Sequence, residues 1–212
     1  GYNRYIYAKK YWKYISRLPI GLKKIFLFIM NNCPNFFKKF LFSFILEDDN
    51  FSIDKKINKI LSKLSNINNK ESFYESMITE WSDSDKITNT EVNNFVKNEY
   101  YNIFSNEEIQ LTDCMMFMDF HTYLTDDILC KVDRSSMNYS LEVRAPFLNS
   151  KLIELAFDMP LDYKIYQNNS KFILKDILSG YIPKEYFLRS KKGFSIPISN
   201  WIRNDLKEWV NE

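Results

Sequence analysis

Cationic side chains gather in a short loop toward the C-terminal end of the chain. Lys184, Arg189, Lys191 and Lys192 stand close together, and Gly193 follows them directly. A lysine supplies a compact positive charge on a flexible stem, and a glycine lets the backbone approach a ligand closely. The loop therefore has the composition of a phosphate-binding site. A solvated basic loop has the same composition, so both interpretations stay open at this point.

A further lysine precedes this loop at the start of an apolar segment. Ser170 is a suitable N-cap for a helix over 171–179, and Gly180 would follow its last turn. Lys171 would then stand at the helix N-terminus, where the helix dipole disfavours a positive charge. Its position therefore favours an anion nearby.

A longer segment with both acidic and basic residues is Tyr123 to Leu148, which reads YLTDDILCKVDRSSMNYSLEVRAPFL. Thr125 is expected to cap a helix over 125–138, with two aspartates in the first turn, where the dipole favours negative charge. Apolar residues recur at helical spacing, so one face of this helix is expected to be buried. That face comprises Ile128, Leu129 and Val132.

Four charged residues in this stretch could touch a nucleotide. Asp133 and Arg134 lie on the expected helix, and Glu142 and Arg144 lie on the segment that follows it. They either orient a bound nucleotide or form an ion-pair network that holds the helix on the following segment. The residue types fit both interpretations.

Composition indicates the scaffold that positions these groups. Apolar residues make up 45% of the 212 residues, which is typical of a globular chain, and 4 glycines with 6 prolines argue against an all-β protein. The chain is therefore expected to be predominantly α-helical. Helices are expected over 73–81, over 92–101, over 151–159 after the cap Asn149, and in a last segment that ends at Val210.

Charge and residue counts exclude several classes of function. A formal charge of +2 gives no electrostatic support for a nucleic-acid partner. The 3 cysteines are far apart, which favours reduced thiols in a cytoplasmic protein over a disulfide scaffold. His121 is the single histidine, so no histidine-based zinc cage or catalytic triad can be built without another chain. We expect it to be half-buried near a helix start.

Two apolar-aromatic runs interrupted by lysines, 22–30 and 36–46, lie near the N-terminus. Neither approaches the roughly 20 apolar residues that span a bilayer, so no transmembrane segment is expected. A helical hairpin packed on the rest of the protein is the favoured interpretation. A basic amphipathic helix that lies on a membrane is the alternative.

As a pattern of identities, YLxDDxLxKVDRxSMxxSLEVRxPFL resembles the signature of the glutamine-hydrolysing asparagine synthetase family. Two segments support the resemblance in the family's order, SKFILKDIL at 170–178 and RSKKGFSIPISNW at 189–201. GYNRY at 1–5 is similar to the end of the family's acidic Gly-Gly-Tyr loop. The chain thus divides into a weakly matching helical region, 1–112, and a signature region, 113–212.

The resemblance implies a particular fold and a particular place in a longer enzyme. The family's synthetase domain has an α/β fold of the adenine nucleotide alpha hydrolase type, with most of its sheet upstream of the signature. The family's SGGxDS pyrophosphate loop and its N-terminal catalytic cysteine are absent from this sequence. We therefore expect the C-terminal portion of a synthetase domain, inactive alone, whose glutaminase domain lies upstream.

The resemblance also implies an activity: ATP-dependent amidation of aspartate to asparagine through β-aspartyl-AMP, with ammonia derived from glutamine. ATP and Mg²⁺ are the implied cofactors, and no protein metal ligand is assigned. Lys191 matches the lysine that contacts the phosphates during adenylation. The further substrate or ATP contacts implied are Lys171, Lys192, Asp133, Arg134, Glu142, Arg144 and Tyr2. Small molecules and the glutaminase domain are the expected partners, and a homodimer is left open.

Two other functions remain in view. A related amidotransferase or cyclase that acts on a sugar or peptide carboxylate would suit the aromatic-rich, weakly matching residues 6–112. A non-catalytic helical interaction module is the second alternative. The joint presence of Lys171, Lys191 and the Asp133–Arg134 pair argues against it, because no structural need for the whole set is evident.

Overall fold

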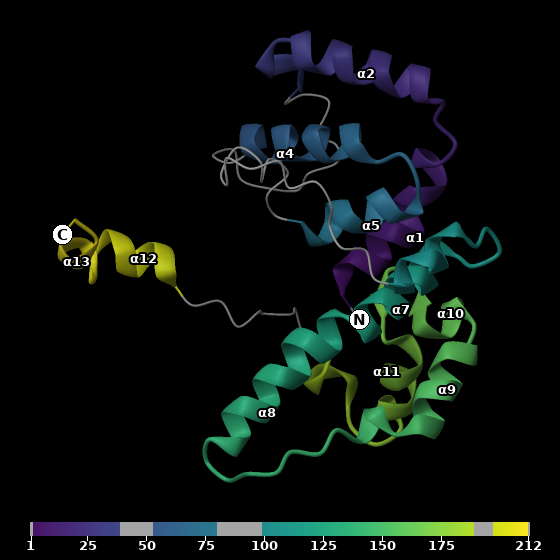
Figure 1. The fold of residues 1–212 in the computed structure, drawn as a ribbon, viewed down its shortest axis with the longest axis vertical. Helices are drawn as coiled ribbons and strands as arrows, with labels where there is room; N and C mark the ends of the chain where they lie inside the picture. Colours follow the sequence, from purple (N-terminus) through teal and green to yellow (C-terminus); the bar gives the residue numbers. More distant parts are fainter. Residues whose placement is uncertain (1, 39–52, 80–98, 189–196, 212) are drawn as a thin grey trace. The chain divides into compact units, whose positions relative to one another are not determined.

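The computed structural model describes residues 2–38, 53–79, 99–188 and 197–211. The chain divides into two compact units, Gly1–Ser170 and Lys171–Glu212. Helices predominate in the described part of both units, as the ribbon shows (Figure 1), and the described sheet is a single two-stranded antiparallel hairpin. The prediction of a predominantly α-helical chain with little sheet is therefore confirmed.

The first unit contains most of the described elements. In chain order they are α1 (Asn3–Ile15), α2 (Ile20–Asn32), α4 (Ile53–Asn66), α5 (Lys70–Ile78), the 3₁₀ helix η1 (Glu99–Ser105), α7 (Leu111–His121), the π-helix η2 (Tyr123–Leu129), α8 (Cys130–Met137), the 3₁₀ turn η3 (Pro146–Leu148), α9 (Ser150–Asp158), α10 (Leu161–Lys164), β1 (Ile165–Tyr166) and β2 (Asn169–Ser170).

The second unit is smaller and wholly helical in its described part. It contains α11 (Phe172–Ser179), the 3₁₀ turn η4 (Lys184–Tyr186), α12 (Ile198–Arg203) and α13 (Lys207–Asn211). Within the ranges that the structure describes, no helix combines the length and the apolarity that a bilayer crossing requires.

The main core of the first unit lies where α1, α5, η1 and α7 meet. α1 and α7 run antiparallel, because Arg4 of α1 contacts Asp119 of α7 while Trp12 and Leu111 line one depression at the other end. Their small and flexible side chains, which include Ala8 and Met118, are almost completely buried. Small residues on one helix let the thioether side chains of the other fill the remaining gaps.

Polar contacts fix the elements that surround this core. Asn69 and Ser72 form a reciprocal capping box at the start of α5, with 2.8 Å between Asn69 Oδ1 and Ser72 N. The Lys70 ammonium donates to the carbonyl oxygens of Asn106 and Ile109 at 2.8 and 3.0 Å. These bonds hold the turn before α7 against α5.

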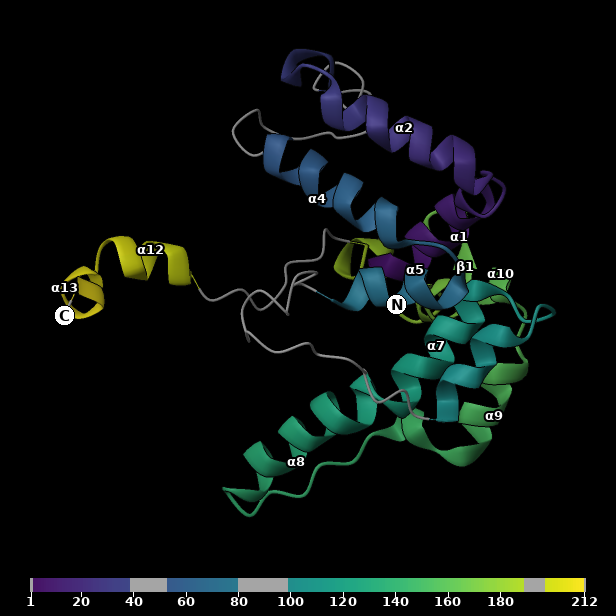
Figure 2. The same ribbon diagram turned by 45° about the horizontal axis from the view of Figure 1, so that its top comes forward.

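α2 and α4 form a separate hairpin with a small core of its own. Met30 of α2 packs with Ile57 and Leu61 of α4. The two helices lie side by side in both ribbon views (Figure 1, Figure 2). The ammonium of Lys23 donates to the carbonyl oxygen of Ile67, which ties α2 to the chain that follows α4. The hairpin expected from the sequence joins the runs 22–30 and 36–46. α2 covers the first run, and most of the second lies outside the described residues, so that hairpin stays a prediction.

The helix predicted over 125–138 is present, but its cap and its burial were predicted wrongly. Thr125 lies inside η2, and its hydroxyl donates to the carbonyl oxygens of His121 and Thr122 at 3.1 Å each, so it is not an N-cap. Val132 is 41% exposed, and Ile128 is only half-buried. Periodicity defines an apolar face in the sequence, but it contains no information about what covers that face.

Several other element boundaries differ from those expected. Ser170 pairs with Ile165 in the hairpin, and Lys171 takes the N-cap position of α11. The last helix is broken into α12 and α13, and the helix expected over 73–81 is α5, which ends at Ile78. The segment 99–101 of the helix expected over 92–101 is 3₁₀, and residues 92–98 lie outside the described residues. By contrast, Asn149 caps α9 as predicted, since its side chain accepts from Lys151 N at 3.1 Å.

Two methionines provide a matched test of where the core lies. Met118 has no exposed surface, and Met137 on α8 is 56% exposed. Met118→Ala is expected to lower the free energy of unfolding by about 2–5 kcal/mol, because it leaves a cavity in the main core. Met137→Ala is expected to change it by no more than about 0.5 kcal/mol. Urea denaturation of the 212-residue chain measures both, and equal losses would contradict the assignment of the core.

Candidate functional site

A buried carboxylate organises the residues that lie next to the signature segment. Asp119 is 4% exposed and accepts hydrogen bonds from three side chains. The Arg4 guanidinium donates from Nε at 3.1 Å and places Nη2 at 2.6 Å, and the Tyr74 hydroxyl donates at 3.0 Å. The Tyr5 hydroxyl is the third donor. Residues from α1, α5 and α7 thus converge on one group.

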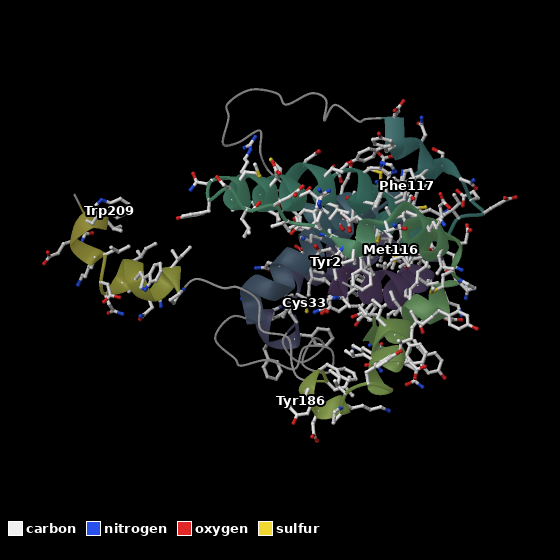
Figure 3. All side chains as sticks on the ribbon, turned by 90° about the horizontal axis from the view of Figure 1, so that it is seen from below. Tyr2, Cys33, Met116, Phe117, Tyr186 and Trp209 are labelled. Atoms are coloured by element: carbon white, nitrogen blue, oxygen red, sulfur yellow. The ribbon has the colours of Figure 1, made fainter. Side chains whose placement is uncertain are left out.

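Aromatic rings surround the Arg4 guanidinium and extend to the first residue of η2. The guanidinium lies 4.7 Å from the Tyr2 ring centroid and 5.5 Å from that of Tyr123. These two rings meet edge to face, with centroids 5.6 Å apart. We call Tyr2, Arg4, Tyr5, Tyr74, Asp119 and Tyr123 the Asp119 cluster. Figure 3 labels Tyr2, which lies between the helices of the first unit with its side chain partly exposed.

The electrostatics of the Asp119 cluster favour the neutral form of its phenols. Burial, followed by the negative charge of Asp119, raises the pKa of Tyr5 and the pKa of Tyr74 well above the ordinary value near 10. Burial lowers the pKa of Arg4, but the hydrogen bond and charge of Asp119 outweigh this and raise it overall. With its donors supplied, Asp119 holds the residues of the cluster together.

The chain changes its helical pitch directly after the Asp119 cluster. η2 is a π-helix, and its N-cap Thr122 has a non-helical backbone with φ of −124° and ψ of −78°. The Thr122 hydroxyl donates back to the Met118 carbonyl oxygen at 2.7 Å. π segments form where side-chain hydroxyls or packing interrupt the regular ladder, and they are frequent at functional sites. The first half of the signature segment is therefore unusual in its backbone.

The four charged residues of the signature do not form the expected network. Glu142 pairs with Arg144, and both side chains are exposed, so water screens the pair. Asp133 and Arg134 are exposed, and neither has an ion-pair partner within the described ranges. Of the two interpretations given above, the structural network is wrong for these residues. Contact with a nucleotide remains a prediction.

Lys171 occupies an uncommon backbone conformation. Its φ is 58° and its ψ is 37°, in the left-handed region that residues with a Cβ rarely adopt. Its side chain is exposed at the start of α11. A non-glycine residue held in such a conformation is a reason to suspect a functional constraint. Lys171 belongs to the second unit, so it is not part of the Asp119 cluster.

Lys191 and Lys192, the lysines on which the predicted phosphate site depends, lie outside the described residues. Tyr2 is the sequence-predicted site residue that the structure places in the Asp119 cluster. In the part of the chain that the structure describes, no group of three His, Cys, Asp or Glu residues could hold a metal ion.

Sequence reasoning missed the cluster residues other than Tyr2. Arg4 and Asp119 are 115 positions apart, and no local pattern connects them. The prediction that His121 is half-buried near a helix start is confirmed. It is half-buried, ends α7, precedes η2 by two residues, and stacks on Tyr100 with ring centroids 4.4 Å apart. That stacking is a structural role.

Comparisons with known proteins identify what the chain is similar to. A family model described as asparagine synthase matches residues 1–212. Asparagine synthetase (glutamine-hydrolyzing) 1 of Bacillus subtilis (strain 168) is 36% identical over 96 residues, which cover 45% of this chain and 15% of that protein. A putative asparagine synthetase (glutamine-hydrolyzing) of Mycobacterium bovis is 38% identical over 97 residues, with the same two shares.

A probable asparagine synthetase of Acanthamoeba polyphaga mimivirus is 30% identical over 80 residues, which cover 35% of this chain and 14% of that protein. The matched part of the chain thus spans about one seventh of the length of these curated relatives. No solved structure matches the chain.

The buried phenols predict a loss of stability at alkaline pH. Since the pKa of Tyr5 and of Tyr74 is raised on folding, their contribution is complete below about pH 10 and decreases as the pH rises further. We expect the free energy of unfolding to fall by about 1.4 kcal/mol per pH unit for each tyrosine above that point. Tyr5→Phe should halve this slope, as measured by denaturation between about pH 9 and 11. An unchanged slope would show that Tyr5 titrates normally.

The backbone of Lys171 predicts a difference between two substitutions. Lys171→Gly removes the Cβ from a left-handed position that costs roughly 1–2 kcal/mol, and the larger unfolded-state entropy of glycine offsets part of the gain. The expected net stabilisation is about 0.5–1 kcal/mol. Lys171→Ala removes the same charge but retains the Cβ, so it should leave stability nearly unchanged. Thermal unfolding of both variants gives the comparison, and equal stabilities would count against a left-handed Lys171.

Proposed function

This chain belongs to the asparagine synthase family, and we propose that it forms part of an enzyme that converts aspartate to asparagine at the expense of ATP. The observation that carries the proposal is the signature segment 123–148, which lies within a family match over residues 1–212. The curated relatives with asparagine synthetase names support the same substrate. The π-helix η2 and the adjoining Asp119 cluster fit a segment whose geometry matters for function.

The proposed reaction has two steps. A side-chain carboxylate oxygen of aspartate attacks the α-phosphorus of ATP, the bond from that phosphorus to the bridging oxygen breaks, and pyrophosphate leaves. Ammonia then attacks the acyl carbon of β-aspartyl-AMP, loses a proton, and displaces AMP. Negative charge grows on the α-phosphoryl oxygens and on the departing pyrophosphate, so fixed cations contribute more than a general base. Mg²⁺ would supply part of that positive charge.

In this proposal the basic residues have different roles toward the phosphates of ATP. Lys191 stabilises the phosphoryl charge in the transition state, with Lys192 as a weaker contact. Lys171, exposed at the start of α11, approaches the same phosphates. Its left-handed backbone and its position against the helix dipole both fit an anionic ligand.

The exposed residues of the signature segment supply the remaining contacts. Asp133, Arg134, Glu142 and Arg144 are open to solvent and thus accessible to a nucleotide. Tyr2 lines the site, held through Arg4 by the Asp119 cluster.

We further propose that an upstream synthetase half and a glutaminase domain complete the enzyme. The signature segment exposes large apolar side chains that a complete domain would be expected to cover. They are Val132, Met137, Leu141, Val143 and Phe147. A homodimer is the alternative cover for the same face.

Ammonia from glutamine would come from the glutaminase domain. The free thiols Cys33, Cys114 and Cys130 fit a reducing, cytoplasmic location.

A related amidotransferase or cyclase that acts on another carboxylate is the second candidate. Its support is the aromatic surface of residues 6–37, where Tyr7, Tyr14 and Phe36 are exposed. The non-catalytic alternative predicts no pyrophosphate release with any acceptor. Incubation of the intact protein with ATP, ammonia and aspartate, or with sugar and peptide carboxylates in place of aspartate, separates the three candidates by which acceptor drives pyrophosphate release.

Lys191→Ala tests the catalytic assignment. Removal of one fixed cation from a transition state typically costs on the order of 3–4 kcal/mol, or roughly two to three decades in rate. We expect that loss in pyrophosphate release by the intact enzyme with aspartate and ammonia, and much less effect on glutamine hydrolysis. Lys191→Arg should rescue poorly, because the larger planar group does not replace a compact ammonium.

Lys192→Ala is the matched control, with an expected loss below about tenfold, or ~1.4 kcal/mol. A large loss in Lys192→Ala together with normal turnover in Lys191→Ala would reverse the two roles. Normal turnover in both variants would mean that the basic loop is a solvated surface.

A further inference from the structure

The N-terminal region and the rest of the chain carry net charges of opposite sign. Residues 1–46 contain nine lysines or arginines and no aspartate or glutamate. The other 166 residues hold 20 of the 29 cations and all 27 acidic residues, which is a net charge of −7. Such an asymmetry points to an anionic partner for the N-terminal region. The overall charge of +2 conceals it.

Part of this positive charge is already used within the protein. The Lys9 ammonium contacts Asp162 at 2.6 Å, Arg4 contacts Asp119, and Lys23 is buried against the Ile67 carbonyl oxygen. Four other cations of α1, α2 and the turn between them have exposed side chains. They are Lys10, Lys13, Arg17 and Lys24.

α2 carries an apolar surface next to these cations. The helix buries Met30 against α4, but large apolar side chains cover most of its remaining circumference and the turn after it, each at least 40% exposed. They are Ile20, Leu22, Ile25, Phe26, Phe28, Ile29, Phe36 and Phe37. Both ribbon views place α2 at the edge of the first unit, on the far side of α4 from α5 (Figure 1, Figure 2). Its apolar surface is therefore accessible.

We propose that α2, together with the exposed cations around it, docks on an anionic lipid bilayer. A helix of 13 residues is too short to cross a membrane, so it would lie in the interface with its apolar side chains among the acyl chains. Lys13, Arg17 and Lys24 would face the lipid phosphates. The exposed tyrosines of α1 have the amphipathic rings that favour the headgroup level.

A bilayer fits this surface better than a protein partner does. The exposed apolar side chains and the cations beside them match an apolar phase bordered by negative charge. An anionic membrane provides both, and it needs no surface of complementary shape. The proposal concerns location and is independent of the reaction proposed above.

Vesicle co-sedimentation of the intact protein tests the proposal. We expect binding to vesicles of phosphatidylcholine and phosphatidylglycerol in equal parts, little binding to phosphatidylcholine alone, and a loss of binding as salt screens the charges. Phe28→Glu should weaken binding at least about tenfold, since it places a carboxylate in the apolar surface. Tyr163→Glu is the control, because it changes an exposed aromatic residue of α10 outside the basic region and should bind like the parent.

A second pair of variants tests the charges separately. Arg17→Gln with Lys24→Gln should weaken binding to the anionic vesicles about tenfold. Lys151→Gln with Lys207→Gln removes the same charge from exposed positions elsewhere and should leave binding unchanged. Circular dichroism confirms that each variant is folded.

Three results would overturn the proposal. One is the absence of binding by the parent protein to either vesicle, and another is equal binding to both that salt does not alter. The third is a change of molar mass in solution when Phe28→Glu is introduced, without any vesicle binding, because α2 would then be covered by a second copy of the chain.

Discussion

The first unit depends on the burial of one carboxylate. Asp119 is removed from water, and a carboxylate in that position is strongly destabilising unless donors replace its hydration. Arg4 and Tyr5 of α1 and Tyr74 of α5 supply those donors. Each donor has a fixed reach, so α1 and α5 have little freedom to slide along or rotate against α7. The positions of Tyr2 and Tyr123, and with them the start of the signature segment, follow from this arrangement.

Local features of the sequence predicted local features of the structure. The cap at Asn149 depends on one side chain and the amide two residues later, and the helical character of the chain depends on propensity and periodicity. The Asp119 cluster depends on partners 45 to 115 positions apart, which no pattern in a single sequence connects. The prediction that Val132 is buried was wrong for a related reason, since periodicity defines an apolar face without specifying what packs against it.

In the candidate site too, local features were predicted correctly and features that depend on distant residues were not. Lys171 was recognised as a misplaced cation at a helix start, and it does stand at the start of α11. The details were wrong because Ser170 pairs with Ile165 in the hairpin and so cannot serve as the cap. The left-handed conformation of Lys171 arises where the chain turns from that hairpin into the helix. A charged residue gives no sequence signal for it, unlike a glycine or an asparagine.

The π-helix η2 has a consequence for how the signature segment tolerates change in length. Successive residues of an α-helix are rotated by about 100°, so a single deletion or insertion turns every later side chain by that angle. η2 absorbs an additional residue between α7, whose face is set by the core, and α8, whose side chains are open to solvent. It therefore sets the rotational phase between the two helices. Substitutions on α8 alter one side chain at a time, whereas a one-residue deletion within 123–129 would redirect Asp133 and Arg134 together and leave the core of the first unit intact.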